Sequence, residues 1–244
     1  NLKGVVYKKS DITIDDDFIK GKMASLLGSD SSEENDSKKI FIQVNRELRT
    51  KNDNTIKEIG SKSSDSIKWK GAFHQLSNSQ VEANFADERT YYINGEPIDQ
   101  QYHLGYDLAV TKRYPIEAAN DGAVVFTGDL GIYGNSIIID HGMGVMTLYG
   151  HVSSIDVKEG DSIKKSQIIG RTGETGLAVG DHLHYGVYIN GVPVRPIEWW
   201  DEKWINDNII LKIKTAEAEF GSKQIKTEAS PEKSSQETDK KVEN

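Results

Sequence analysis

The chain has 244 residues, with 30 basic and 38 acidic side chains and therefore a net charge of −8. This charge repels phosphate, which argues against general affinity for nucleic acid or for anionic membranes. The absence of cysteine excludes disulfide scaffolds, thiolate zinc fingers and cysteine nucleophiles. No apolar run approaches the roughly 18 residues that span a bilayer, so we predict no transmembrane segment in this chain. The length suits one sizeable domain with extensions, or two small domains.

The first 30 residues contain two short β-prone pieces, Gly4–Tyr7 and Asp11–Ile14. We interpret residues 1–30 as the end of an upstream β element. The chain opens at Asn1 without an initiator methionine or a signal-peptide pattern, so we interpret it as a fragment or a processed form of a longer protein.

Residues 31–68 are predicted to form a helical connector. The stretch from Ser31 to Ile59 has no glycine or proline, and most of its apolar residues are spaced as one narrow helical stripe. Ser31–Glu34 offers hydroxyl caps and early acids for the helix start, and Gly60 lies where a C-terminal cap belongs. Because the rest of the segment is polar, we expect the helix to lie on a surface.

The following region, residues 69–212, has the pattern of a mainly β domain. It holds most of the glycines, since 15 of the 22 lie between Gly105 and Gly191. Its short β-like runs recur about every ten residues, which favours an antiparallel β sandwich or open barrel. The runs are Leu108–Val110, Gly122–Phe126, Ser136–Ile139, Val145–Leu148, Ile168–Ile169 and His184–Ile189.

Two features mark the end of this domain. Asn190-Gly191 is a strong signal for a two-residue hairpin turn, and Pro196–Asp201 has the pattern of a short aromatic helix with proline in its first turn. Residues 213–244 are rich in Lys, Glu, Ser, Thr and Gln, so their composition predicts a disordered tail.

Four of the six histidines fall into three local patterns. His103 and Asp107 are separated by Leu-Gly-Tyr, and they converge on one metal only if the chain bends at Gly105; an ordinary loop histidine and a capping aspartate remain the alternative. His182 and His184 alternate along a strand and therefore share one face, where they serve a metal, a shared substrate or neither. His151 ends an apolar strand and is uninformative alone.

Taken together, two imidazoles and one carboxylate are a standard open zinc set that leaves a fourth position for water. Zinc lowers the pKa of that water to roughly 7, and further histidines nearby supply a general base or stabilise an oxyanion. Without cysteine the ligands must be nitrogen and oxygen, which suits a catalytic site. His74 and His141 have no partner pattern, and we assign them no role.

The order His-x-Gly-x-Asp, Tyr-Gly-His and Gly-Asp-His-Leu-His resembles the lysostaphin/LytM-type zinc endopeptidases, which cut peptide bonds in bacterial cell walls. The resemblance runs from about Val81 to Trp200 and includes Asn84–Tyr92, Pro115–Gly122, Gly134–Gly142, Val157–Asp161 and Ile168–Gly173. One departure is Ala86, where relatives usually carry glycine in a Phe-Gly-x-x-Arg segment.

This resemblance implies a role for each of five residues. His103, Asp107 and His184 would bind one zinc ion. His151 and His182 would be the catalytic histidines, one helping to deprotonate the water and the other polarising the scissile carbonyl or stabilising its oxyanion. The sequence leaves open which does which.

The resemblance also implies a peptidoglycan peptide as substrate and a place in the cell envelope, periplasmic or secreted. We favour a D,D-endopeptidase. The alternative is a non-hydrolytic module that binds the wall or regulates an amidase. The helix of residues 31–59 could pack beside the substrate groove and make a self-inhibitory contact, an idea that deletion of residues 1–68 would test.

Overall fold

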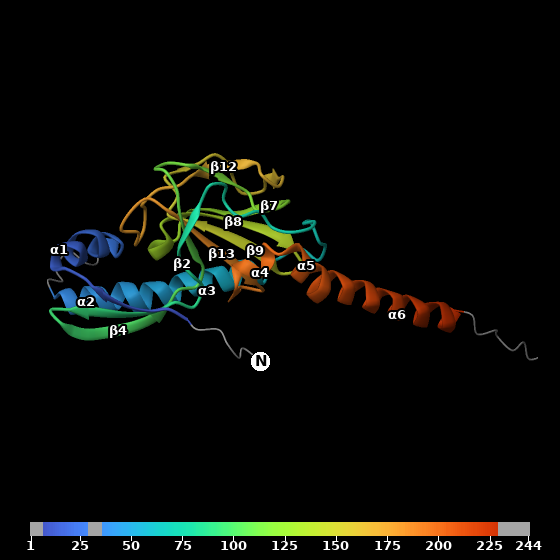
Figure 1. Cartoon of the computed structure of the whole chain (residues 1–244), viewed down its shortest axis with the longest axis horizontal. Coiled ribbons are helices and arrows are strands. Elements are labelled where there is room, and N and C mark those ends of the chain that lie inside the picture. The colour runs from blue at the N-terminus through green and yellow to red at the C-terminus, as the bar shows by residue number, and fades with distance from the viewer. Residues whose placement is uncertain (1–6, 29–35, 229–244) are drawn as a thin grey trace, which may run out of the picture. The chain divides into compact units, whose positions relative to one another are not determined.

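The computed structural model describes residues 7–28 and 36–228, with side chains as far as residue 220. The chain divides into two units, residues 1–202 and 203–244. The described strands all belong to the first unit, where they form one large and two small sheets (Figure 1). The expected β pieces at Gly4–Tyr7 lie mostly outside the described residues.

The large sheet has eight strands, and every pairing in it is antiparallel. Its strand order is β11-β7-β8-β9-β13-β5-β2, and β14 pairs with the far half of β13. The bounds are β2 Gln80–Ala83, β5 Tyr106–Ala109, β7 Gly122–Asp129, β8 Asn135–Gly142, β9 Val145–Gly150, β11 Ser162–Ile163, β13 Leu183–Ile189 and β14 Val192–Val194.

Two three-stranded sheets flank this core. In one, β1 runs parallel to β3, which forms an antiparallel hairpin with β4. In the other, β12 lies between β10 and β6. The bounds are β1 Lys9–Thr13, β3 Glu88–Ile93, β4 Glu96–Tyr102, β6 Pro115–Glu117, β10 Ser154–Ile155 and β12 Ile168–Arg171.

The prediction of a mainly β, antiparallel fold is confirmed. The Ile137–Ile139 run of β8 is buried on both faces, as its unbroken apolar sequence requires. Asn190 and Gly191 form the predicted turn between β13 and β14, and both have positive φ, at 50° and 75°. A two-residue hairpin turn of this type demands that geometry.

The N-terminal helical region differs from the prediction in its bounds: additional helical turns precede it, and the long helix runs from Ser37 to Gly60. Helix α1 (Asp16–Phe18) and the π-helical segment η1 (Ile19–Met23) follow β1 and were not predicted. The long helix is continuous from α2 (Ser37–Ile42) through the π-helical segment η3 (Gln43–Leu48) to α3 (Arg49–Gly60). Its N-cap is Asp36, whose carboxylate accepts from the Lys38 amide; the expected cap residues 31–34 lie outside the described residues.

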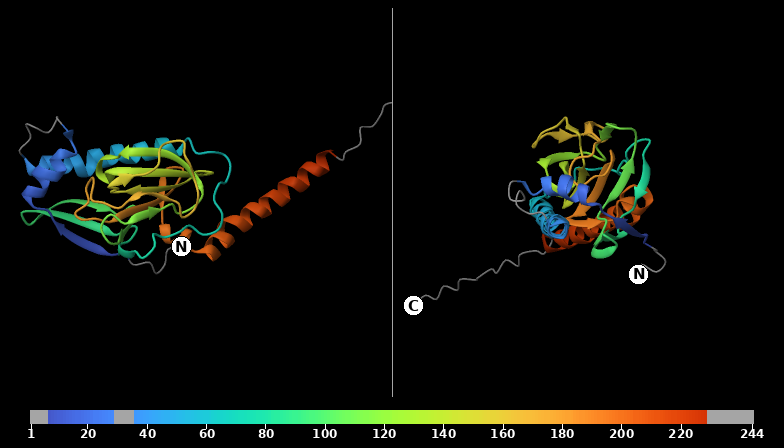
Figure 2. Two further views of the ribbon diagram at one scale, coloured as in Figure 1. Left: turned by 90° about the horizontal axis from the view of Figure 1, so that it is seen from above. Right: turned by 90° about the vertical axis from the view of Figure 1, so that its left-hand side faces the viewer.

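The long helix lies alongside the large sheet (Figure 2). Most of its apolar stripe is buried, with Ile40, Phe41, Val44 and Ile56 at most 1% exposed in one core cluster with residues of β3, β8, β9 and β13. The Oδ1 atom of buried Asn52 accepts from the Ile132 amide at 3.0 Å. The predicted connector is therefore an integral wall of the first unit.

Gly60 has a different role from the predicted cap, because the cap residue is Ser61 and no positive φ is required at Gly60. A Cβ atom at Gly60 would lie 2.5 Å from the Gly191 amide nitrogen. Glycine is needed there because the end of the helix touches the β13–β14 turn.

The remaining helices are one turn within the strand region, three short segments after the last strand and the 18-residue helix α6. They are the 3-10 turn η4 (Gly131–Tyr133), α4 (Pro196–Trp199), α5 (Glu202–Ile205), the π-helical η5 (Asn206–Ile210) and α6 (Leu211–Glu228). Helix α4 matches the predicted aromatic helix. Among the described residues, no helix is both long and apolar enough to cross a membrane.

Helix α6 differs from the disordered tail expected from residue 213. The composition argument counted apolar residues, whereas Leu, Lys, Ala and Glu are all strong helix formers that need no core to favour a helix. Residues 229–244 lie outside the described residues.

Candidate metal centre

Strand register brings the five predicted site residues to one end of the large sheet. His184 on β13 lies opposite Asp107 on β5 and also opposite Gly150 on β9, the residue before His151. His182 directly precedes β13, and His103 directly follows β4. The antiparallel pairing of β9, β13 and β5 therefore joins sequence patterns that are up to 81 residues apart.

The predicted bend at Gly105 makes this convergence possible. A Cβ atom there would lie 2.6 Å from the Tyr185 carbonyl oxygen and 2.7 Å from the His184 ring. Any larger residue would push His184 away, so Gly105 lets His103 and Asp107 meet the strand that carries His184.

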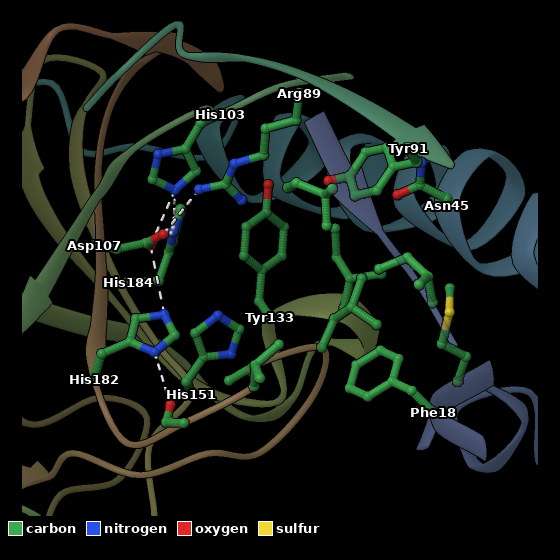
Figure 3. A pocket seen from close by; sticks show the side chains of 18 of the residues that line it. Phe18, Asn45, Arg89, Tyr91, His103, Asp107, Tyr133, His151, His182 and His184 are labelled. Carbon is green, nitrogen blue, oxygen red and sulfur yellow. Dashed lines mark hydrogen bonds and ion pairs between the residues drawn. The ribbon is translucent and has the colours of Figure 1, made fainter. Parts of the chain in front are cut away.

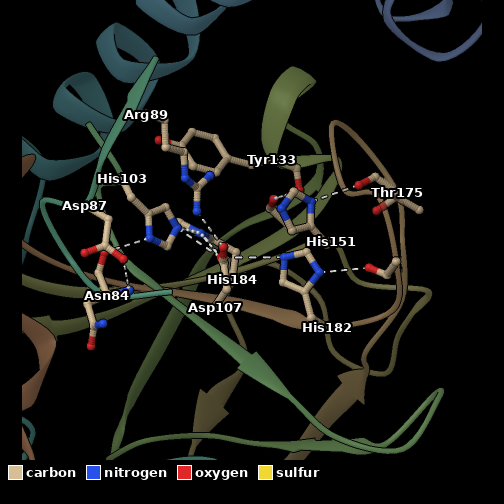
Figure 4. A network of polar contacts seen from close by, with 12 residues as sticks. Asn84, Asp87, Arg89, His103, Asp107, Tyr133, His151, Thr175, His182 and His184 are labelled. Carbon is tan, nitrogen blue, oxygen red and sulfur yellow. Dashed lines mark hydrogen bonds and ion pairs between the residues drawn. The ribbon is translucent and has the colours of Figure 1, made fainter. Parts of the chain in front are cut away.

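The three predicted metal ligands form a tight, buried triangle (Figure 4). His103 Nε2 is 3.1 Å from His184 Nδ1, and both nitrogens approach Asp107 Oδ1, at 3.0 Å and 3.1 Å. Ligand atoms about 2 Å from a tetrahedral zinc ion are about 3.3 Å apart, so the triangle fits that ion. Three lone-pair donors this close also repel one another unless a proton or cation lies among them.

Neighbouring groups fix the orientation of these ligands. His103 Nδ1 donates to the Asn84 carbonyl at 3.0 Å, which leaves Nε2 unprotonated and available to a metal. Arg89 donates to the second carboxylate oxygen of Asp107, also at 3.0 Å. By contrast, Nε2 of His184 is buried without a hydrogen-bond partner among the described residues.

A tight turn at residues 84–87 holds His103 from the outside. Its backbone amide at Ala86 donates to the His103 carbonyl, and the His103 amide donates to the Asp87 carbonyl. Ala86 has a positive φ of 65°, a conformation that costs any residue with a Cβ atom. The positive φ explains why relatives usually carry glycine at this position. In this chain the same turn forms with alanine.

The two predicted catalytic histidines lie together beside the triangle. Their ring centroids are 4.8 Å apart, and His182 Nε2 is 3.5 Å from Asp107 Oδ1. His151 Nδ1 donates to the Thr175 carbonyl at 2.8 Å, and His182 Nδ1 donates to the Gly180 carbonyl at 2.8 Å. In both imidazoles Nε2 is thus the atom left to exchange a proton.

The environment shifts the two pKa values in opposite directions. Burial lowers the pKa of His151 well below its usual value, and the neighbouring imidazoles of His182 and His184 lower it further. Burial also acts to lower the pKa of His182, but its hydrogen bond and charge interaction with Asp107 outweigh this and raise it. The pKa of Asp107 itself is well below normal: burial opposes this, and the histidine contacts outweigh burial.

The cluster opens into a pocket of about 450 Å³ (Figure 3). One wall, here called the metal-side wall, is formed by the five predicted site residues together with Arg89 and Tyr133. The ring centroid of Tyr133 is 5.2 Å from that of His184. The other walls come from the N-terminal segment, the long helix and the loop before His182. Those residues include Ile12, Ile14, Phe18, Met23, Phe41, Asn45, Arg49 and Leu177.

Several pocket residues were not predicted from the sequence. Arg89 of the pocket, and Asn84, whose carbonyl accepts from His103 outside the pocket lining, belong to a segment that carried the family resemblance, so their position was signalled although their contacts were not. Tyr133 and Arg49 had no signal, because only the packing of the long helix and of η4 brings them to the pocket. His74 and His141 lie outside the pocket lining.

Comparison with known proteins gives a family match for part of the chain. The model of Peptidase family M23 matches residues 101–196, a span that contains all five predicted site residues. Residues 101–196 of this chain match an M23 peptidase domain. The predicted resemblance to lysostaphin/LytM-type peptidases is thereby confirmed, and the stretch from residue 81 to 100 lies before the family match.

Curated relatives are similar over the same region. The DD-carboxypeptidase/endopeptidase Mpg of Neisseria meningitidis serogroup B is 43% identical over 95 residues, 39% of this chain and 22% of Mpg. The peptidoglycan DD-endopeptidase ShyA of Vibrio cholerae is 34% identical over 119 residues, 49% of this chain and 27% of ShyA. The matching part of the M23 chain thus spans about a quarter of these relatives.

A solved structure extends the similarity beyond the family match. A Pseudomonas aeruginosa protein described as a candidate M23 peptidase aligns with a TM-score of 0.52 at 25% identity. The alignment covers 66% of this chain and 62% of that protein. The M23 fold is therefore shared over about two thirds of the chain.

Proposed function

We propose that this M23 chain is a zinc-dependent endopeptidase that hydrolyses peptide bonds in bacterial peptidoglycan. The observation that carries the proposal is the convergence of His103, Asp107 and His184 within about 3 Å of one another, beside two further imidazoles in one pocket. Ligands and proton-transfer groups in one cavity are what metal-assisted hydrolysis requires.

Three residues of the chain would hold the ion: His103 through Nε2, His184 through Nδ1 and Asp107 through Oδ1. When bound, zinc would polarise the scissile carbonyl and lower the pKa of water to roughly 7. The hydrogen bonds from Asn84 and Arg89 keep the ligand atoms aimed at one point, as outer groups do in other metal sites.

His151 and His182 supply the proton-transfer groups. Each donates from Nδ1 to a backbone carbonyl, so each presents Nε2 to the pocket. One would take a proton from the attacking water, and the other would polarise the carbonyl or stabilise the developing oxyanion. Loss of either imidazole is expected to lower kcat by about 10²–10⁴-fold.

We propose D,D-linked wall peptides as the substrate, because Mpg and ShyA are both named for action on DD bonds. Peptidoglycan lies in the cell envelope, so we also propose a periplasmic or secreted location. The finer choice of bond would follow from the masses of released fragments.

We further propose that the N-terminal region limits access to the site. Ile12, Ile14, Phe18 and Met23 line the same pocket as the metal-side residues, so this segment occupies space that a long peptide would cross. Phe18→Ser should then increase the rate of hydrolysis of intact wall. An unchanged or lower rate in a folded variant would contradict the proposal.

The main test is digestion of purified peptidoglycan followed by mass spectrometry. We expect cross-linked dimers to be converted to monomers with zinc and to persist with a chelator. His151→Ala and His182→Ala should be inactive, and His74→Gln, which alters a histidine outside the pocket, should be active. Binding of zinc and wall without any cleavage would favour the non-hydrolytic module instead.

A further inference from the structure

The long helix contributes a cation to the pocket that the M23 ligand pattern does not include. Arg49 begins α3, is partly buried and lines the pocket that also holds the metal cluster. Arg89 lines the same pocket, but it is already paired with Asp107 at 3.0 Å. Unlike Arg89, Arg49 therefore brings to the pocket wall a positive charge that is not paired with a metal-ligand carboxylate.

The hydrogen bonds of Arg49 go to a neutral residue. Its Nε donates to the Asn45 carbonyl at 3.1 Å, and Nη2 donates to Asn45 Oδ1 at 2.8 Å. A guanidinium has five N–H donors, so three of them remain for other partners. Within the described part of the chain, no carboxylate lies within 4 Å of Arg49 to form an ion pair.

Asn45 is itself locked in the orientation that holds Arg49. It is fully buried, and its Nδ2 donates to Asp99 Oδ2 at 2.8 Å, so its Oδ1 must face Arg49. The charge of Asp99 is balanced by Arg46, whose Nη2 lies 2.8 Å from Asp99 Oδ1. The network thus orders the Arg49 side chain without neutralising it.

The acidic residue one turn further along the helix makes no ion pair with Arg49 within the described part of the chain. Asp53 lies one turn further on and contacts the Tyr133 hydroxyl at 3.4 Å. Burial raises the pKa of Asp53, and the charge of Arg49 acts in the opposite direction, so the two side chains interact electrostatically without a direct ion pair. A partly buried, preorganised guanidinium that lacks an ion-pair partner is suited to receive an anion from solution.

We propose that Arg49 binds a carboxylate of the substrate peptide and so sets which peptides the site accepts. This inference rests on the proposed peptidase function, and it adds a specificity residue supplied by the N-terminal helix. A guanidinium holds a carboxylate through two parallel hydrogen bonds. Stem peptides offer such groups from two sources, the free α-carboxylate of γ-linked glutamate and the carboxylate at the peptide's C-terminus.

The expected effect is on substrate binding, because Arg49 is anchored to α3 and Asn45 and not to the metal ligands. A charge-assisted hydrogen bond contributes enough for at least about a tenfold change in affinity. Loss of such uniform binding raises KM and leaves kcat nearly unchanged. A residue that only supported the fold would instead alter kcat, zinc content or stability.

The test uses the zinc-loaded full chain and purified cross-linked muropeptide dimers in three forms: unmodified, amidated at the glutamate α-carboxylate, and amidated at the C-terminus. The variants are Arg49→Gln, Arg49→Lys and the control Lys51→Gln, an exposed cation two residues away on the same helix and outside the pocket. Zinc content and circular dichroism confirm that each variant is folded.

We expect one of the two amidations to raise KM for the wild type about tenfold or more, which identifies the source of the carboxylate. Arg49→Gln should show that raised KM with the unmodified dimer and no response to amidation, whereas Lys51→Gln should behave as wild type. Arg49→Lys should be intermediate, because lysine keeps the charge but not the paired donors.

Two results would overturn the inference while leaving the peptidase function intact. One is a wild type that cleaves all three dimers equally, and the other is an Arg49→Gln variant that keeps the wild-type preference. If the wild type cleaves no dimer, the peptidase proposal fails. Calorimetric binding of the same three dimers then tests the carboxylate site by itself. Amide-sensitive binding that Arg49→Gln abolishes would preserve the carboxylate site, and its absence would refute it.

Discussion

His141 provides a stability prediction whose size follows from its surroundings. Its ring is fully buried, with Nδ1 donating to the Asp121 carbonyl at 2.7 Å and Nε2 lying 2.8 Å from Thr147 Oγ1. The Phe73 ring packs against it with centroids 4.9 Å apart. Burial lowers the pKa of His141 to about 4, from a usual 6.5.

The sign and magnitude follow from proton uptake. Between pH 6.5 and 4 the unfolded chain binds a proton at this residue and the folded chain does not, so acid stabilises the unfolded state. A pKa difference of about 2.5 at 1.36 kcal/mol per unit is about 3 kcal/mol. The free energy of unfolding should therefore fall by about that amount, from this residue alone, as the pH is lowered to 4.

The assay compares the wild type with His141→Gln by urea denaturation at several pH values, both with a chelator present so that zinc binding does not contribute. Glutamine is uncharged throughout, and it can still donate and accept a hydrogen bond. The wild type should lose about 3 kcal/mol more than the variant between pH 7 and 4. Parallel curves, or an NMR titration that places the pKa of His141 near 6.5, would refute the reasoning.

Three further predictions concern the surroundings of the site. Ala86→Gly should raise the free energy of unfolding by roughly 0.5–1 kcal/mol in urea denaturation, because the relief of positive φ exceeds the entropy cost of glycine; a less stable variant would contradict the turn geometry. Arg89→Leu should weaken zinc binding about 10–100-fold in competition with a chromogenic chelator, and an unchanged affinity would mean that Arg89 does not orient Asp107. Lys22→Met should accelerate hydrogen exchange in loop 174–178, whose carbonyls the Lys22 ammonium contacts, whereas unchanged exchange would show that these contacts do not hold the loop.

The candidate site residues could be predicted from the sequence because each of their motifs spans only a few residues. The His103–Asp107 spacing, the Gly105 bend and the alternation of His182 and His184 are each encoded within a few residues. What joins them is the antiparallel register of β9, β13 and β5. Alternation along β13 places His182 and His184 on one face, whereas the pairing of the three strands is seen only in the structure.

The residues that form the other walls of the pocket could not be predicted in this way. Whether Phe41 or Arg49 faces the M23 site depends on how the long helix packs against the sheet, and a narrow apolar stripe does not say which partner it meets. The helical turns at Asp16–Met23 were missed because the neighbouring residues are β-prone. The helical start of the tail was missed because low apolar content outweighed helix propensity in the prediction.

The central claim is that one zinc ion, held by His103, Asp107 and His184, switches on peptide hydrolysis. Its most direct test is to titrate zinc into the metal-free chain while following the conversion of cross-linked muropeptide dimers to monomers. We expect the rate to be zero without metal and to rise to a plateau at one zinc ion per chain, and we expect no such rise for His103→Ala. Hydrolysis by the metal-free chain, or a fully zinc-loaded chain that cleaves nothing, would contradict the account.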